Sequence, residues 1–181
     1  MTYLFIPLSI VLLFIVFLYN NLIGKKNKVK EAYSSIDVML KKRSDLIPQL
    51  VNTVKGYLKH ESETLISITK LREKVVDDKL SIDKRLNLES EMDRLFSKLN
   101  VSMEDYPDLK ASQSFMLLQS SLNEVEEQLS AARRAYNAAV NAFNNALQMF
   151  PSNIMGRAMG YTNQDLYKID PSDAIQPKVS F

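Results

Sequence analysis

The sequence of 181 residues contains no cysteine and no tryptophan, only one histidine and only four glycines. Without cysteine the chain can form no disulfide, thiolate metal site, cysteine nucleophile or lipoprotein anchor. A single histidine, His60, argues against a histidine-based metal site, and neither GxGxxG nor GxxxxGK[ST] occurs to cradle a phosphate. The formal net charge of +2 is too small to indicate nucleic-acid binding. We therefore expect no cofactor, no metal and no enzymatic activity.

One long stretch carries no charged side chain, YLFIPLSIVLLFIVFLYNNLI, Tyr3–Ile23. About 20 apolar residues in a helix cover the roughly 30 Å hydrocarbon core of a bilayer, so this stretch is long enough to cross a membrane. It lacks the basic start and the small-residue cleavage site of a signal peptide, and its apolar core is too long for one. The sequence therefore predicts a retained transmembrane anchor over residues 1–24.

The flanks of this stretch indicate its orientation in the membrane. No lysine or arginine precedes it, whereas four juxtamembrane lysines follow it: Lys25, Lys26, Lys28 and Lys30. Since basic residues stay on the cytoplasmic side, we expect a single-pass protein of the bacterial inner or plasma membrane, with its N-terminus outside and residues 25–181 in the cytoplasm. The same lysines can also attract anionic lipid, although a role as topology signals alone explains them equally well.

Beyond the anchor, apolar residues recur every three or four positions, which predicts helices rather than strands. The longest run begins near Asp108 and needs a partner of similar length, because about 42 residues of helix extend roughly 60 Å. Its apolar positions are Phe115, Leu118, Leu122, Val125, Leu129, Ala132, Tyr136, Val140, Phe143, Leu147 and Phe150.

Three shorter helices precede this run. Their apolar positions are Val29, Tyr33, Ile36, Leu40, Ile47, Leu50, Val51 and Val54; then Leu65, Ile68, Leu71 and Val75; then Ile82, Leu86, Met92, Leu95 and Leu99. The lengths favour an all-α fold in which the anchor leads into an elongated antiparallel up-and-down bundle of four helices over residues 25–150. If residues 25–75 instead formed one helix, the bundle would have three. A short amphipathic helix and an extended tail follow over residues 151–181.

The first bundle helix carries residues with several structural roles open to them. Gly56 suits a left-handed cap at the end of this helix. Pro48 falls in a tolerated first turn if Asp45 caps a fresh helix, and otherwise kinks a longer one. Arg43 lies either on a solvated face or beside an acid of the third helix, and Asp37 either faces solvent or serves as a buried partner for such a cation.

Two further surfaces are candidates for contact with partners. The segment YNAAVNAFN places Asn137 and Asn144 seven residues apart beside small residues, so these asparagines, together with Ala138 and Ala142, fit either interhelical register within the chain or an interface with another subunit. Ser152 or Asn153 can cap the short helix that follows. Its apolar side suits a lipid surface, or else closes the end of the bundle. That apolar side comprises Ile154, Met155 and Met159.

Four segments carry a resemblance to a known family: IDVMLKKRSDLIPQLVNTVKGYLKHE, EDYPDLKA, YNAAVNAFN and FPSNI. In these segments the chain resembles the LemA family of membrane-anchored bacterial proteins, from Tyr19 to about Tyr161. The family usually has tryptophan, glutamine and asparagine where this chain has Tyr33, Met39 and Gln49. The resemblance implies one N-terminal membrane helix and a cytoplasmic helical bundle, and it supplies no catalytic residues.

Two functional hypotheses follow. In the first, the chain is a non-enzymatic scaffold that contacts membrane lipid, associates with copies of itself and organises or shapes the membrane. In the second, it is an adaptor that presents a cytoplasmic client to a membrane protease or signalling protein.

Overall fold

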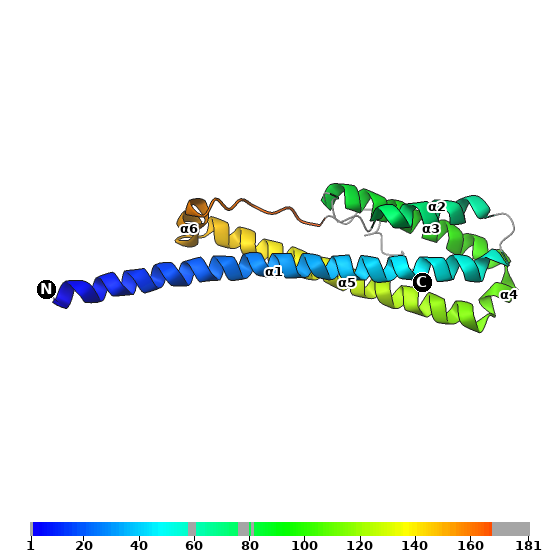
Figure 1. The fold of residues 1–181 in the computed structure, drawn as a ribbon, viewed down its shortest axis with the longest axis horizontal. Coiled ribbons are helices and arrows are strands. Elements are labelled where there is room, and N and C mark those ends of the chain that lie inside the picture. The colour runs from blue at the N-terminus through cyan, green and yellow to red at the C-terminus, as the bar shows by residue number, and fades with distance from the viewer. Residues whose placement is uncertain (1, 58–60, 76–79, 81, 168–181) are drawn as a thin grey trace, which may run out of the picture. The chain divides into compact units, whose positions relative to one another are not determined.

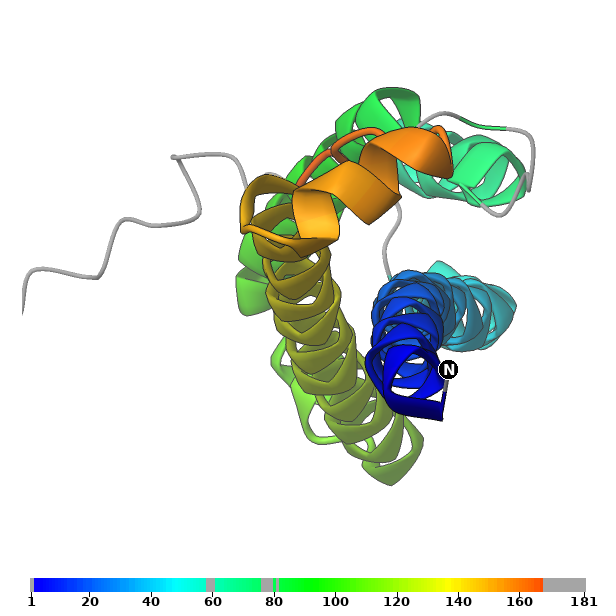
Figure 2. The same cartoon turned by 90° about the vertical axis from the view of Figure 1, so that its left-hand side faces the viewer.

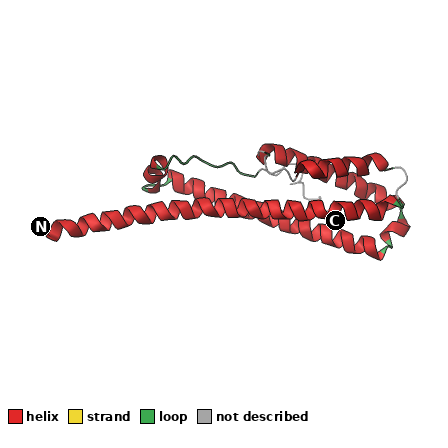
Figure 3. Cartoon of the chain, in the orientation of Figure 1, coloured by secondary structure: helices red, strands yellow, loops and turns green. Residues whose placement is uncertain are grey.

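The computed structural model describes residues 2–57, 61–75, 80 and 82–167, which form helices joined by short loops and contain no strand (Figure 3). The helices in chain order are α1 (Thr2–Lys55), α2 (Ser62–Val75), α3 (Ile82–Ser102), α4 (Pro107–Lys110), α5 (Gln113–Gln148) and α6 (Ser152–Ala158), with the 3-10 turn η1 (Met103–Asp105) between α3 and α4 (Figure 1). The predicted all-α fold class is therefore confirmed. His60 and the tail from residue 168 lie outside the described residues.

Helix α1 contains both the apolar stretch and the first bundle helix in one run of 54 residues, about 80 Å long. It continues through Pro48, so the fresh turn capped by Asp45 does not form. Proline has no N–H, and the carbonyl of Ser44 four residues earlier therefore receives no helix hydrogen bond from it. Because α1 ends at Lys55 and α2 begins at Ser62, residues 25–75 are two helices rather than one.

Two other element boundaries differ from those predicted. The long C-terminal helix begins at Gln113 rather than near Asp108, since the short α4 after Pro107 stands apart from it. Ser152 does not cap α6, whose N-cap residue is Pro151. The Ser152 hydroxyl instead points towards the carbonyl oxygens of Ala146 at 2.6 Å and Met149 at 2.9 Å. It therefore supplies a hydrogen bond to carbonyl groups that the end of α5 leaves without a helical partner.

The left-handed glycine cap occurs at Gly160 and not at Gly56. Among the described residues only Gly160 has a positive φ, +67°. Its N–H donates to the Arg157 carbonyl at 3.0 Å, and the Tyr161 N–H donates to the Gly156 carbonyl at 2.9 Å. This pair of bonds is a Schellman motif, which ends α6 and sets the direction of the segment after it.

Replacing Gly160 with alanine is expected to destabilise this cap by about 1–2 kcal/mol, because a side chain disfavours its left-handed conformation. The backbone amide of Tyr161 should then exchange its hydrogen roughly tenfold faster, as hydrogen-exchange mass spectrometry of the full chain can measure. Gly24→Ala is the control, since a Cβ there meets nothing within 4 Å and should leave that amide unchanged. Equal exchange in Gly160→Ala and the parent chain would contradict the role of the cap.

The chain divides into two compact units, which are described separately. Unit 1 comprises residues 1–35 and 132–166, and unit 2 comprises residues 36–131 and 167–181. The division into an anchor, a bundle and a C-terminal region at residues 24 and 150 stays a prediction.

Unit 2 is a helical bundle built from parts of α1 and α5 together with α2 and α3. The four apolar positions predicted for α2 are all buried, as are most of those predicted for the other helices. The buried apolar side chains of unit 2 are Ile36, Leu40, Ile47, Leu50, Val54, Leu65, Ile68, Leu71, Val75, Met92, Leu99, Met103, Leu109, Phe115, Leu118, Val125, Leu129 and Tyr167. The apolar periodicity therefore identified the core-facing sides of α1, α2 and α5, whereas on α3 only Met92 and Leu99 of the predicted positions are buried among the described side chains.

Unit 1 pairs the first part of α1 with the last part of α5. The rings of Tyr33 and Tyr136 lie 5.7 Å apart between the two helices, and Leu22 of α1 is fully buried. Figure 2 shows α6 lying across the C-terminal end of α5. Phe150, predicted as the last core position of α5, is instead 79% exposed because α5 ends at Gln148 and the chain turns there.

The apolar stretch at the start of α1 is uncovered by the rest of the chain. Its large side chains from Phe5 to Phe17 are between 46% and 67% exposed. In the described part of the chain, α1 alone is long and apolar enough to cross a membrane. An exposed apolar surface of this length is what membrane anchoring requires.

Candidate functional site

Charged side chains connect the helices of unit 2. Arg43 on α1 contacts Asp93 of α3 at 2.5 Å and Glu126 of α5 at 3.3 Å. The prediction that Arg43 pairs with an acid of the third helix is therefore confirmed. The Arg72 Nε–H of α2 donates to the Ser44 hydroxyl of α1 at 3.1 Å. Since each bond joins two different helices, the set fixes which faces of the four helices meet.

A second pair of charges lies deeper in unit 2. Arg85 on α3 is only 2% exposed, and its guanidinium pairs with the carboxylate of Asp37 on α1. Glu89, one turn further along α3, is equally buried and accepts a 2.5 Å hydrogen bond from the Tyr167 hydroxyl. Asp37 therefore pairs with a cation, as one of its two predicted roles required, but its own side chain is 37% exposed and only the cation is buried.

One cavity beside the polar network of unit 2 is too small for a substrate. It is lined by Arg43, Ser44, Arg72 and Glu89 together with apolar neighbours, and its volume is about 10 Å³. That volume holds at most one water molecule. No group of three potential metal ligands occurs among the described residues. What the network is seen to do is join the helices of unit 2.

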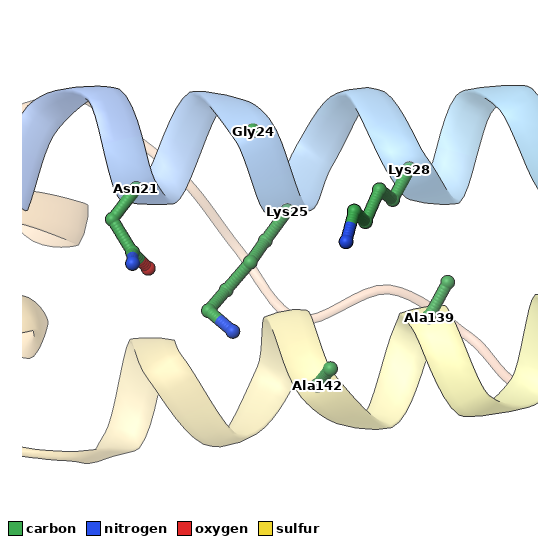
Figure 4. Close-up of a pocket in the computed structure, with 6 residues that line it drawn as sticks. All are labelled: Asn21, Gly24, Lys25, Lys28, Ala139 and Ala142. Carbon is green, nitrogen blue, oxygen red and sulfur yellow. The ribbon is translucent and has the colours of Figure 1, made fainter.

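A much larger hollow lies within unit 1, between α1 and α5. It has a volume of about 300 Å³, at the lower end of the range of ligand pockets. Figure 4 shows the side chains of Asn21, Lys25 and Lys28 directed from α1 towards α5. The opposite wall consists of Ala139 and Ala142. This pocket, with two cations at the end of the apolar stretch, is the candidate functional site.

Aromatic and cationic side chains hold the chain beside this pocket. The ring of Tyr161, directed by the cap at Gly160, has its centroid 5.8 Å from that of the Phe143 ring, and the Lys26 ammonium lies 4.2 Å from the centroid of the Tyr161 ring. A cation over an aromatic face contributes about 0.5–1 kcal/mol at an exposed site. The segment after α6 is therefore tied to both α5 and α1 near the anchor.

Side chains of α5 form hydrogen bonds with the backbone of Gln164 and Asp165, the next residues of unit 1. The Asn144 side chain both donates to the Gln164 carbonyl and accepts from the Gln164 N–H, each at 2.9 Å. The Tyr136 hydroxyl donates to the Asp165 carbonyl at 3.1 Å. Burial, with smaller contributions from Tyr33 and the Asp165 carboxylate, raises the pKa of Tyr136 above 10.0, so this hydroxyl keeps its proton at neutral pH.

The residues predicted as sites occupy different environments. Of the four juxtamembrane lysines, Lys25 and Lys28 line the pocket, Lys26 contacts Tyr161 and Lys30 is exposed elsewhere. Among the predicted interface residues, Ala138 and Ala142 are exposed and Asn137 is half-buried. On α6, Ile154 is 61% exposed whereas Met155 and Met159 are half-buried. Their assignment to a partner or to lipid stays a prediction.

Sequence reasoning missed the charged residues of the core. Arg85 and Glu89 precede Met92 on α3 at steps of four and three, so the three share one face. The apolar pattern predicts a buried face that includes Leu86 and Leu95, and both are only half-buried. The sequence does contain a sign of this burial, since Arg85 and Glu89 share a helix face with Met92. A search for apolar residues alone does not detect it, because it ignores charged residues.

Together, the two units define a helical-bundle protein with one N-terminal helix that can cross a membrane. A family model described as the LemA family matches residues 32–181, and the chain belongs to this family. The protein is also similar to Protein LemA of Metamycoplasma hominis, with 26% identity over 161 residues, which cover 89% of this chain and 74% of that relative. The resemblance found in the sequence is therefore confirmed.

Proposed function

We propose that the chain is a non-enzymatic scaffold, anchored in a bacterial membrane with its N-terminus outside, that self-associates and organises or shapes that membrane. The observation that carries the proposal is that, within unit 1, the chain after α6 returns to the end of the apolar stretch. Lys26 lies three residues after the apolar stretch, and it contacts Tyr161, which directly follows α6 and its cap. Residues 135 positions apart in the sequence therefore meet at the membrane boundary.

Exposed apolar side chains near this contact support a role at the lipid surface. Met149, Phe150 and Ile154 are 64%, 79% and 61% exposed, and they flank the turn between α5 and α6. Large apolar side chains at the level of the headgroups insert into the boundary between headgroups and acyl chains. Several copies of the chain, each inserting such a group on one leaflet, would deform that leaflet.

An exposed side of α5 outside the pocket lining supports self-association. Ala135 and Ala138 lie three residues apart on α5, and both are exposed. Small side chains allow the backbone of a neighbouring helix to approach closely, which is the usual basis of helix association at membranes. A second copy of the chain is the partner that the proposal places on this face.

Native mass spectrometry of the full chain in mild detergent tests self-association. The expected masses are multiples of 20.7 kDa. Tryptophan at Ala135 and Ala138 should shift the particles to single chains, because the bulky rings hold the neighbouring helix away. Ser120→Trp, at another exposed position of α5, is the control and should leave the masses unchanged. A strictly monomeric parent chain would overturn the proposal.

An adaptor is the second candidate, because unit 2 also exposes large apolar side chains that a client could cover. They are Val38, Ile66, Val101, Met116 and Leu117. Cross-linking in cells followed by mass spectrometry separates the two candidates. The scaffold predicts mainly links between copies of this chain, whereas the adaptor predicts links from these side chains to one dominant different protein.

A further inference from the structure

Two lysines of α1 line the hollow between α1 and α5, beside the buried Leu22 and Val29. Asn21, Lys25 and Lys28 follow at steps of four and three, so they share one face, and Figure 4 shows all three directed towards α5. In the described part of the chain, neither lysine forms an ion pair and the Asn21 amide forms no hydrogen bond. Two ammonium groups one turn apart repel each other, and an anion between them would relieve this repulsion.

The space between the helices remains open because the residues around it are small. Ala139 and Ala142 end at their Cβ atoms, and a Cβ added at Gly24 would meet no heavy atom within 4 Å. The resulting hollow of about 300 Å³ is roughly thirtyfold larger than the 10 Å³ cavity of unit 2. It can therefore accept a polyatomic anion rather than a single water molecule.

The depth of the pocket matches the headgroup layer of a bilayer. The apolar stretch ends at Ile23, and the pocket extends from Asn21 to Lys28, about 10 Å along the helix axis. Each headgroup layer is about 5–8 Å thick, from a total thickness of about 40–45 Å and a hydrocarbon core of about 30 Å. The pocket therefore begins near the end of the apolar stretch, at the depth expected for the lipid headgroups.

We infer that this pocket binds the phosphate group of an anionic membrane lipid, an inference that rests on the membrane anchoring within the proposed function. Ammonium groups donate charge-assisted hydrogen bonds to phosphate oxygens, and the two lysines supply two point charges for one anion. The Asn21 amide adds a donor on the membrane side. The alanine wall accepts the glycerol backbone, and the acyl chains extend along the uncovered apolar stretch of α1.

Native mass spectrometry of lipids retained by the full chain tests the inference. The chain is reconstituted in phosphatidylcholine nanodiscs that contain a minor fraction of phosphatidylglycerol, and one phosphatidylglycerol per chain is expected to survive release. Lys25→Gln or Lys28→Gln should lower its retention roughly tenfold, the effect of losing one charge-assisted bond. Ala142→Leu, which fills the pocket without changing the charge, should lower it similarly.

Lys30→Gln is the matched control, because it removes one exposed lysine of the same stretch outside the pocket. It should change retention by less than roughly twofold, as expected for general attraction to the surface. A loss as large as that of Lys28→Gln would overturn the inference, since binding would then be diffuse. Unchanged retention in both pocket-lysine variants would overturn it as well.

The same phosphate chemistry could come from a soluble source. Glycerol phosphate is therefore added to the full chain in nanodiscs of phosphatidylcholine alone. Binding that depends on Lys28, without any preference for phosphatidylglycerol, would overturn the assignment to lipid. The number of chains per particle is read in the same spectra, so failure of lipid binding and failure of self-association are separate results.

Discussion

Arginine at both Leu12 and Val16 is expected to remove the chain from the membrane. These side chains lie in the middle of the apolar stretch and are 63% and 48% exposed, so no protein partner in the chain would shield the charges. On the insertion scale each arginine costs about 2.5–3.5 kcal/mol, and each lost apolar residue forfeits about 0.3–0.6 kcal/mol. The pair therefore opposes insertion by roughly 6–8 kcal/mol.

Carbonate extraction of membranes from expressing cells measures this effect. The parent chain should remain in the extracted membranes, and the double-arginine variant should appear in the supernatant or be degraded. Leu12→Ile with Val16→Leu is the control, since it changes shape and keeps the apolar character of both positions. Equal retention of the arginine variant and the control would show that this stretch does not anchor the chain.

Arg85→Ala is expected to be among the most destabilising single substitutions in unit 2, by about 3–5 kcal/mol. The guanidinium is 2% exposed and pairs with Asp37, while Glu89 is buried one turn away. Removing the cation leaves the buried Glu89 carboxylate without a positive charge one turn away and the partly exposed Asp37 without its partner. The loss of the buried aliphatic part of the arginine adds a packing defect.

Urea unfolding of the full chain in mild detergent, followed by circular dichroism, measures this change. Lys98→Ala on the exposed side of α3 is the control and should stay within about 0.5 kcal/mol. The double variant Arg85→Met with Asp37→Leu should recover part of the loss, because apolar replacement removes both desolvation penalties. If Arg85→Ala were as mild as Lys98→Ala, the pair would contribute nothing to the bundle.

Sequence periodicity identified most of the helices because a helix exposes one face and buries the other. Leu65, Ile68, Leu71 and Val75 recur at steps of three and four, and all four are buried on α2. Periodicity missed the start of α5 at Gln113, because the residues just before it form the separate short helix α4. A pattern of apolar residues records which face is buried and does not record where a short helix stops.

The glycine caps show why local chemistry was insufficient. Gly56 and Gly160 both follow helices, yet only Gly160 has a positive φ. At Gly160 the chain must return along α5 so that Tyr161 reaches Phe143 and Lys26. Whether a glycine uses its freedom depends on where the next segment packs, which no window of sequence contains.

The candidate site was partly visible in the sequence. The four lysines after the apolar stretch were recognised as one group, but their separation into pocket residues, a Tyr161 contact and an exposed residue was not. The lysines differ because they project from different sides of α1, and only some of those sides face α5. This difference became visible only once Ala139 and Ala142, more than a hundred residues away in sequence, were placed opposite Lys25 and Lys28.

By itself, the sequence determined the helical fold, the apolar stretch that can cross a membrane and the family, because periodicity, length and local motifs are properties of neighbouring residues. The tertiary structure alone decided that Arg85 and Glu89 are buried and that small residues of α5 leave a hollow opposite two lysines. Burial and cavities depend on which distant segments meet, and the free energy of those contacts is a property of the whole fold.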